Sequence, residues 1–206
     1  MGPDGYWDAI IEIAPVGDSS EARNFLYNLY TSWAKQRGSQ VIMVREPTAS
    51  DEPVMLAVRG HYAFGYLVNE AGHHRVRNGK KQSIARITVV PWSDRTAPAP
   101  IGQQRALKGH GQLGGKLRSR IEVGTSGLVI QNDLTLNDNL ELASEIATNW
   151  HPERTTTVPM VRRYDLTPFL CRDFQTSRDF TRSDILRPKE FHGLLSSRVE
   201  LRAEHA

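Results

Sequence analysis

Asp18-Ser-Ser-Glu-Ala-Arg-Asn-Phe-Leu-Tyr-Asn-Leu-Tyr-Thr-Ser-Trp-Ala-Lys-Gln-Arg-Gly38 is the most regularly patterned stretch of the chain. Its apolar residues recur every three or four positions, which places them on one face of an α-helix. Asp18 and Glu21 have the spacing of an N-terminal capping box, and Gly38 is a typical helix stop. A helix with one apolar face must lie on another element. That face consists of Ala22, Phe25, Leu26, Leu29, Tyr30, Trp33 and Ala34.

Runs of β-branched residues on both sides of this helix predict the sheet on which it lies. Residues 8–15 precede the helix, and residues 41–45 and 54–59 follow it. Farther on, Asn78-Gly79 is a strong signal for a two-residue hairpin turn between two more strands. We therefore expect an α+β fold. The other expected elements are strands at 73–77, 83–90, 103–107, 117–123, 128–131 and 160–164, and helices at 60–72, 135–150 and 188–198.

Two stretches typical of linkers divide the chain. Residues 94–102 contain Pro98 and Pro100, and residues 151–157 begin with His-Pro. The expected elements between these linkers form a small β-β-β-α module, residues 98–152. We predict that it is inserted into a larger sheet-plus-helix module that is built from both chain ends, residues 1–97 and 153–206.

A basic, glycine-rich loop is expected inside the inserted module, in the stretch Ala106-Leu-Lys-Gly-His-Gly-Gln-Leu-Gly-Gly-Lys-Leu-Arg118. It contains four glycines and no acidic residue. Glycine adopts positive φ without steric cost and lets backbone N–H groups approach a ligand closely. The pattern predicts a loop that meets a polyanion with its backbone. An ordinary mobile surface loop is the alternative interpretation.

Positive charge is concentrated in one quarter of the chain. Residues 72–123 hold eleven Lys and Arg against two acids, a net charge of +9, whereas the rest of the chain carries −6. Such a cluster favours contact with the phosphate backbone of a nucleic acid, with a chance imbalance as the alternative. The candidate RNA-binding residues are Arg75, Arg77, Lys80, Lys81, Arg86, Arg105, Lys108, Lys116, Arg118 and Arg120.

The composition argues against several other classes of protein. No apolar run approaches the roughly 18 residues of a membrane span, and the N-terminus lacks the pattern of a signal peptide. The single cysteine, Cys171, excludes an internal disulfide and fits a reducing compartment, the cytoplasm or an organellar matrix. The histidines, including His61 and His73, lack the spacing of a metal site, so we expect neither a metal nor a cofactor.

Several stretches taken together resemble the bacterial and organellar class-I peptide chain release factors, closest to the type that reads UGA. The matching segments cover nearly the whole chain and occur in the same order as in the family. The family's N-terminal helical domain has no counterpart in this sequence. The matching stretches are Asp8-Ala-Ile-Ile-Glu-Ile13, Gly60-His-Tyr-Ala-Phe-Gly-Tyr-Leu-Val-Asn-Glu-Ala-Gly-His-His-Arg-Val76, Arg120-Ile121, Gly124-Thr-Ser-Gly-Leu-Val129, Gln131-Asn-Asp133, Val161-Arg-Arg-Tyr164 and Arg172-Asp-Phe-Gln-Thr176.

The resemblance implies two functional loops, and this chain departs from the family at both. The family reads a stop codon with a tripeptide in a longer loop, whereas Val76-Arg-Asn-Gly-Lys-Lys-Gln82 runs directly into the next strand. The resemblance therefore implies that standard stop-codon reading is lost.

The second departure is in the family's Gly-Gly-Gln loop, which promotes hydrolysis of the peptidyl-tRNA ester. Here Gly-Ala-Gly-Gly-Gln becomes Gly109-His-Gly-Gln112, one residue shorter. Gly111 and Gln112 are then the candidate catalytic residues, with His110 replacing a glycine. Counting back from Arg120 without a gap aligns His110 with the glutamine instead, and Gly114-Gly-Lys116 offers a third register.

Three functions follow as hypotheses. The first is a release-factor-like protein that binds the ribosome or RNA without standard codon reading or hydrolysis. The second is a codon-independent or rescue-type peptidyl-tRNA hydrolase that acts on the ribosome, and the third is an enzyme that acts on a tRNA or an aminoacyl ester away from the ribosome. The implied partners are the ribosomal A site with its rRNA and peptidyl-tRNA, and we expect a monomer with no membrane partner.

Overall fold

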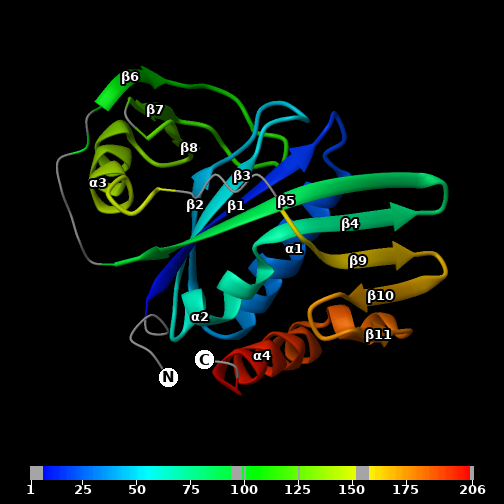
Figure 1. The fold of residues 1–206 in the computed structure, drawn as a ribbon. Helices are drawn as coiled ribbons and strands as arrows, with labels where there is room; N and C mark the ends of the chain where they lie inside the picture. Colours follow the sequence, from blue (N-terminus) through cyan, green and yellow to red (C-terminus); the bar gives the residue numbers. More distant parts are fainter. Residues whose placement is uncertain (1–6, 94–98, 100, 125, 152–157, 205–206) are drawn as a thin grey trace.

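The computed structural model describes residues 7–93, 99, 101–124, 126–151 and 158–204. Within these residues the strands form one mixed sheet, in the order β11-β10-β9-β4-β5-β1-β3-β2-β8-β7-β6 (Figure 1). None of the described helices has the length and hydropathy of a membrane span. The strands are β1 (Asp8–Val16), β2 (Gln40–Arg45), β3 (Val54–Arg59), β4 (Gly72–Asn78), β5 (Lys81–Trp92), β6 (Ile101–Ala106), β7 (Ser119–Val123), β8 (Leu128–Asn132), β9 (Met160–Leu166), β10 (Phe169–Asp173) and β11 (Arg178–Phe180).

The helices are α1 (Glu21–Gln36), α2 (Ala63–Leu67), α3 (Leu136–Ile146) and α4 (Pro188–Glu204), with 3₁₀ turns η2 (Val68–Glu70) and η3 (Ser183–Leu186), within the described part of the chain. The predicted α+β class, with a sheet-plus-helix unit from both chain ends and a β-β-β-α segment between them, is confirmed.

Helix α1 packs on one face of the sheet, as its periodicity predicts. Leu26 and Trp33 are fully buried in a core that α1 shares with β1, β3, β4, β5 and α4. The predicted capping box is wrong, because Ser20 is the N-cap and its side chain makes no capping bond, while the N–H of Ala22 in the first turn donates to Oγ of Ser83 on β5 at 3.1 Å. The helix ends at Gly38 as predicted. Gly38 follows the last turn with a φ of +71°, and its N–H donates to the carbonyl of Lys35.

The hairpin of β4 and β5 is present, with its turn one residue later than predicted. Asn78 pairs with Lys81, so Gly79 and Lys80 are the two turn residues. Gly79 has a φ of +60°, the conformation for which hairpins select glycine. Figure 1 shows this turn at one extremity of the molecule.

The segment β6–β7–β8–α3 extends the same sheet and packs over the face opposite α1. There it forms the second hydrophobic core of the protein, in which Ile121, Ile130 and Ile146 pack with Ile10 and Met55 of the central strands. It joins the rest of the sheet through a short parallel contact between β2 and β8, where Arg45 pairs with Gln131. The helix α3 starts at a capping box, in which Thr135 is the N-cap and Asp138 is at N3.

Strands β10 and β11 were not predicted, and α4 is longer than the helix expected at 188–198. The two strands have five and three residues and lie among charged residues, so they lack the apolar alternation of a longer strand. They extend the sheet beyond β9 at the edge near α4 (Figure 1).

A fully buried charge network joins α4 to the sheet. Arg162 on β9 forms two hydrogen bonds with the carboxylate of Glu70, at 2.9 and 3.0 Å. Arg198 on α4 bridges Glu70 and Asp173. Burial acts to raise the pKa of Glu70, but Arg162 and Arg198 outweigh it and lower the pKa to about 2.

We predict that His74, in the same network, makes stability pH-dependent. Its Nε2 donates to the Glu70 carbonyl at 2.9 Å, and its Nδ1 is buried without a partner among the described residues. Burial lowers the pKa of His74 from 6.5 to about 4. The unfolded chain therefore binds a proton as the pH falls below about 6.5, while the folded protein does not until about pH 4. Stability should be complete above this window and fall by about 3 kcal/mol across it.

Urea titrations between about pH 7 and pH 4 measure this loss. His74→Gln keeps a donor for the Glu70 carbonyl and removes the titration, so its stability should fall less over the same window. The exposed His151→Gln is the control and should behave as the wild type. Equal losses in the wild type and His74→Gln would contradict the assignment.

Candidate functional site

The glycine-rich loop between β6 and β7 is a compact, internally bonded turn. The N–H of Gly111 donates to the Gly115 carbonyl at 2.8 Å, and the N–H of Leu117 donates to the Gly109 carbonyl at 3.0 Å. Gly109 and Gly114 have φ values of +121° and +86°, which only glycine adopts without strain. The glycines therefore fix the shape of this loop.

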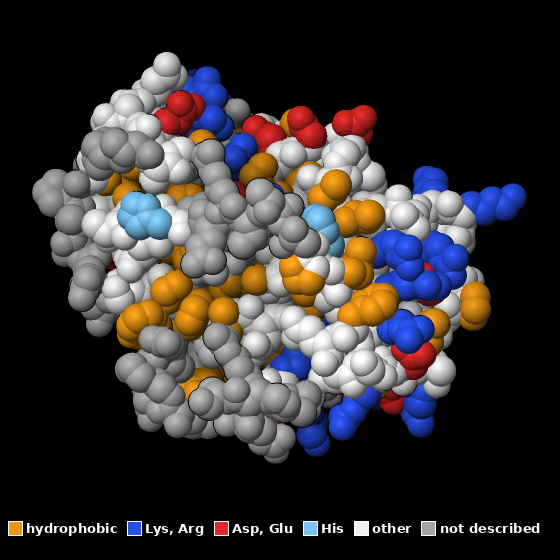
Figure 2. Space-filling model, in the orientation of Figure 1, with side chains coloured by type: hydrophobic (Ala, Val, Ile, Leu, Met, Phe, Trp, Pro, Cys, Tyr) orange, Lys and Arg blue, Asp and Glu red, His pale blue; other side chains and the backbone are white. Residues whose placement is uncertain are grey.

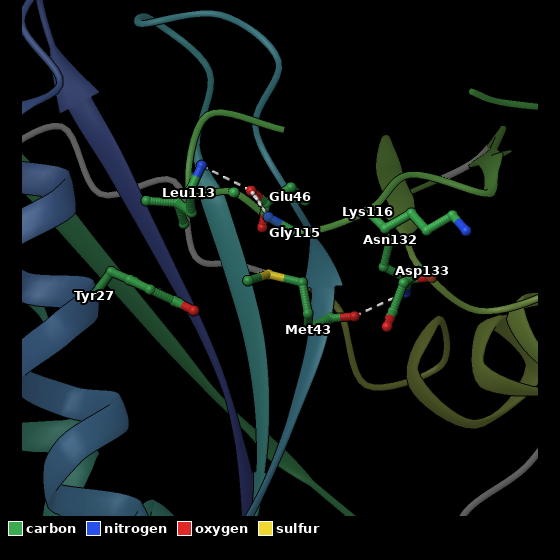
Figure 3. Close-up of a pocket in the computed structure, with 9 residues that line it drawn as sticks. Tyr27, Met43, Glu46, Leu113, Gly115, Lys116, Asn132 and Asp133 are labelled. Atoms are coloured by element: carbon green, nitrogen blue, oxygen red, sulfur yellow. Dashed lines mark hydrogen bonds between the residues drawn. The ribbon is translucent and has the colours of Figure 1, made fainter. Parts of the chain in front are cut away.

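A buried carboxylate from the β2–β3 connection holds the loop. Glu46 is 1% exposed, and its Oε1 accepts hydrogen bonds from the N–H of Leu113 at 2.8 Å and of Gly115 at 3.3 Å. Figure 3 shows the carboxylate pointing into the curve of the loop. A Cβ on Gly111 would lie 2.0 Å from Cγ of Glu46, and one on Gly115 would lie 3.0 Å from Oε2. A side chain at position 111 therefore collides with Glu46, whereas one at position 115 would require the carboxylate to shift by a few tenths of an ångström.

Gln112 is held through both its backbone and its side chain. Its N–H donates to the Pro47 carbonyl at 2.8 Å, and its Oε1 accepts from Nη2 of Arg23 at 2.9 Å. Arg23 is fully buried in α1, and its Nη1 also donates to the carbonyls of Ala49, Ser50 and Glu52. The residue Gln112 is nevertheless exposed at the surface.

The predicted catalytic residues are thus close together, but their backbone donors are occupied. The N–H groups of Gly111 and Gln112 both bond to carbonyls of this chain. His110 is exposed and lies opposite Lys116 in an isolated bridge. In this conformation neither N–H is free to bind a developing oxyanion.

A pocket of about 280 Å³ lies beside the loop, between α1 and the β8 end of the sheet (Figure 3). It brings one cation, Lys116, near two acids, Glu46 and Asp133. This mixture of charges does not favour a phosphate. In the described part of the chain, no group of three or more His, Cys, Asp or Glu side chains is placed to hold a metal ion.

The predicted RNA-binding residues fall into two groups. The first lies on the β4–β5 hairpin, where Arg75 is half-buried and Arg77, Lys80, Lys81 and Arg86 are exposed. Two of them have acidic partners: Arg77 pairs with Asp165 at 3.0 Å and Lys81 with Glu21 at 4.0 Å.

The second group lies on β6, β7 and the loop between them. Arg105, Lys108, Lys116 and Arg118 are exposed, and Arg120 pairs with Glu122 at 2.8 Å. The fold therefore distributes the basic segment over two surfaces.

Sequence reasoning missed the two residues that hold the loop, Arg23 and Glu46. Arg23 lies in a helix whose apolar face was correctly identified, and Glu46 lies in a polar connection. Nothing in the local pattern of either residue indicates a partner far along the chain. Arg23 and Gln112 are 89 positions apart.

Comparison with known proteins shows which proteins this chain resembles. A sequence profile described as the PCRF domain matches residues 2–88. Peptide chain release factor 2 of Helicobacter acinonychis (strain Sheeba) is 29% identical over an alignment of 157 residues, which covers 64% of this chain and 43% of that protein. In sequence, the chain is similar to peptide chain release factors.

Two further comparisons give the extent of the similarity. Peptide chain release factor 2 of Lactiplantibacillus plantarum is 32% identical over an alignment of 115 residues, which covers 48% of this chain and 30% of that protein. These matches span less than half the length of the curated relatives. RF2 of Thermus thermophilus superposes with a TM-score of 0.78 at 20% identity, over 100% of this chain and 71% of that one, which shows the fold.

We predict that Gly111→Ala releases the loop from Glu46, because the new Cβ and Cγ of Glu46 would be only 2.0 Å apart. Loss of the hydrogen bonds to Leu113 and Gly115 should accelerate exchange of these two amide protons by about tenfold or more. Hydrogen exchange followed by NMR measures the rates.

Gly193→Ala in α4 is the matched control, since its Cβ would meet no described atom within 4 Å. Its loop amides should exchange as in the wild type. Unchanged exchange at Leu113 and Gly115 in Gly111→Ala would show that Glu46 does not hold the loop.

Proposed function

We propose that the chain acts in translation termination as a release-factor-like protein that binds the ribosome and its RNA without standard stop-codon recognition, and that it does not hydrolyse peptidyl-tRNA while its Gly-Gln loop is docked. Similarity to peptide chain release factors and the two basic surfaces support the binding role. Lys and Arg side chains neutralise phosphates, and such contacts provide most of the sequence-independent affinity for nucleic acid.

The docked loop is the observation that carries the proposal. Ester hydrolysis requires donors that face the oxygen on which negative charge develops. The N–H of Gln112 is bonded to Pro47 at 2.8 Å, and its side chain is bonded to Arg23 at 2.9 Å. Both groups that the family resemblance assigns to hydrolysis are therefore engaged within the protein.

The short hairpin supports the loss of codon reading. Only Gly79 and Lys80 separate the paired residues Asn78 and Lys81. A two-residue turn leaves no room for the longer, tripeptide-bearing loop that the resemblance implies. Lys80 and Lys81 are exposed there and suit phosphates, which carry no sequence information.

One observation favours the rescue-type hydrolase as a second candidate. Gln112 is exposed, and a few hydrogen bonds hold the loop, each contributing about 0.5–1.5 kcal/mol net. Contacts with a ribosome that favour the undocked loop can supply a few kcal/mol. In that event Gly111 and Gln112 would act at the ester after undocking.

A release assay separates the two candidates. Ribosomes carrying labelled peptidyl-tRNA, with a stop codon, a sense codon or an empty A site, are mixed with the full chain. We expect retention of the protein on the ribosome, weakened by salt, and release of label no faster than in buffer. A peptidyl-tRNA hydrolase known to act on these ribosomes is the positive control.

Release of label that Gly111→Ala abolishes would establish the hydrolase instead. Failure to bind any of the three ribosome complexes at low salt would contradict both candidates. Lys80→Gln combined with Lys81→Gln should weaken binding and reduce its salt dependence, since two phosphate contacts are removed.

A further inference from the structure

Three arginines occupy neighbouring positions on three adjacent strands. In the parallel pairing of β4 with β9, Arg75 is opposite Arg163, and in the antiparallel pairing of β9 with β10, Arg163 is opposite Arg172. Residues directly opposite each other have their side chains on the same face of the sheet. The row therefore combines Arg75, from the basic segment, with two arginines that lie far outside it in sequence.

The face that carries this row is the one opposite α1 and α4. On β9 the alternate residues Arg162 and Tyr164 point into the helix-covered core, so Arg163 and Asp165 point away from it. Arg77 and Arg86 share this outer face, because Arg77 is opposite Asp165 and Arg86 is opposite His73. Figure 2 shows Lys and Arg side chains gathered over β4, β9 and β10.

The charges on this face are only partly compensated. Asp165 serves both Arg77 and Arg163, and Asp179 lies 3.6 Å from Arg172. Nε of Arg75 is buried and has no hydrogen-bond partner among the described residues. Like charges placed directly opposite in a sheet destabilise it. Glu12 on β1 also lies on this face and interacts electrostatically with Arg86. An arrangement of five arginines against three acids is therefore suited to an anion that bridges them.

An exposed aromatic ring lies at the end of the row. Phe174 is 42% exposed, and the guanidinium of Arg172 lies 5.6 Å from the centre of its ring. The N–H of Phe174 donates to the Val161 carbonyl at 3.0 Å, which fixes the residue beside β9. Aromatic rings and arginine planes are the groups on which unpaired bases stack. In a duplex the base faces are stacked on one another and are inaccessible to such a ring.

We propose that this arginine face, formed by Arg75, Arg77, Arg86, Arg163, Arg172 and Phe174, binds a short single-stranded segment of RNA. The arginines contact the phosphates, and one base stacks on Phe174 and Arg172. The inference rests on the proposed RNA-binding function and assigns to it a surface that lies outside both functional loops.

The test measures fluorescence anisotropy of the full chain with a labelled single-stranded RNA of about 12 nucleotides, and with the duplex of the same sequence. The wild type should bind the single strand more tightly than the duplex. Phe174→Leu keeps the apolar volume but loses the ring, and Arg172→Gln loses the guanidinium charge. Each should weaken single-strand binding by about fivefold or more.

Two variants serve as controls. Phe174→Trp keeps an aromatic surface and should bind within about twofold of the wild type. Lys35→Gln removes an exposed cation from the last turn of α1, on the opposite side of the sheet, and should also bind within about twofold. Urea titrations of all variants confirm that they remain folded.

The outcomes separate this inference from the proposed function. Wild-type affinity in both Phe174→Leu and Arg172→Gln, with loss of binding in Lys80→Gln and Lys81→Gln, overturns the arginine face and leaves the proposed function standing. Tighter binding to the duplex overturns the assignment to a single strand. Binding to neither RNA nor the ribosome overturns both.

Discussion

Glu46 is the residue on which the arrangement of the two halves of the sheet depends. Its N–H donates to the Gln131 carbonyl at 2.6 Å, and its own carbonyl accepts from Nε2 of Gln131 at 2.7 Å. Its carboxylate bonds two N–H groups of the Gly-Gln loop. A buried carboxylate is costly unless it is hydrogen-bonded, so the loop and the carboxylate stabilise each other. One residue thereby joins β2, β8 and the loop.

A polar set next to Glu46 makes the contact between β2 and β8 specific. Nδ2 of Asn132 donates to the Met43 carbonyl at 2.7 Å, and Asn132 and Asn139 exchange hydrogen bonds at 2.8 and 3.0 Å. Buried amides with all their partners present fix one register, since any shift would leave them unsatisfied. The β6–β7–β8–α3 segment is therefore attached in a defined position, although only one residue pair joins β2 and β8 as strands.

The sequence predicts the local elements well and the long-range contacts poorly. The 3.6-residue period of α1 depends on adjacent residues, so its buried face was identified correctly, including Trp33 and Leu26. The capping box was wrong because Ser20 is the N-cap and the N–H of Ala22 in the first turn is satisfied by Ser83, which is distant in sequence. The loop's partners Arg23 and Glu46 depend on contacts between distant segments. A single sequence contains no signal for such contacts.

The buried charge network also explains how a weakly paired sheet edge can present a fixed arginine row. Along β9 and β10, Arg162 and Asp173 point into the network, while the next residues, Arg163 and Arg172, point to the other face. The outermost strand, β11, has three residues and adds little to hold this edge. Burying ions contributes less to net stability than apolar packing of the same volume, but breaking one partner is strongly unfavourable. Because Arg198 of α4 bridges Glu70 and Asp173, displacing β10 from β9 would leave buried charges unpaired. The network thus holds the backbone from which Arg163 and Arg172 project.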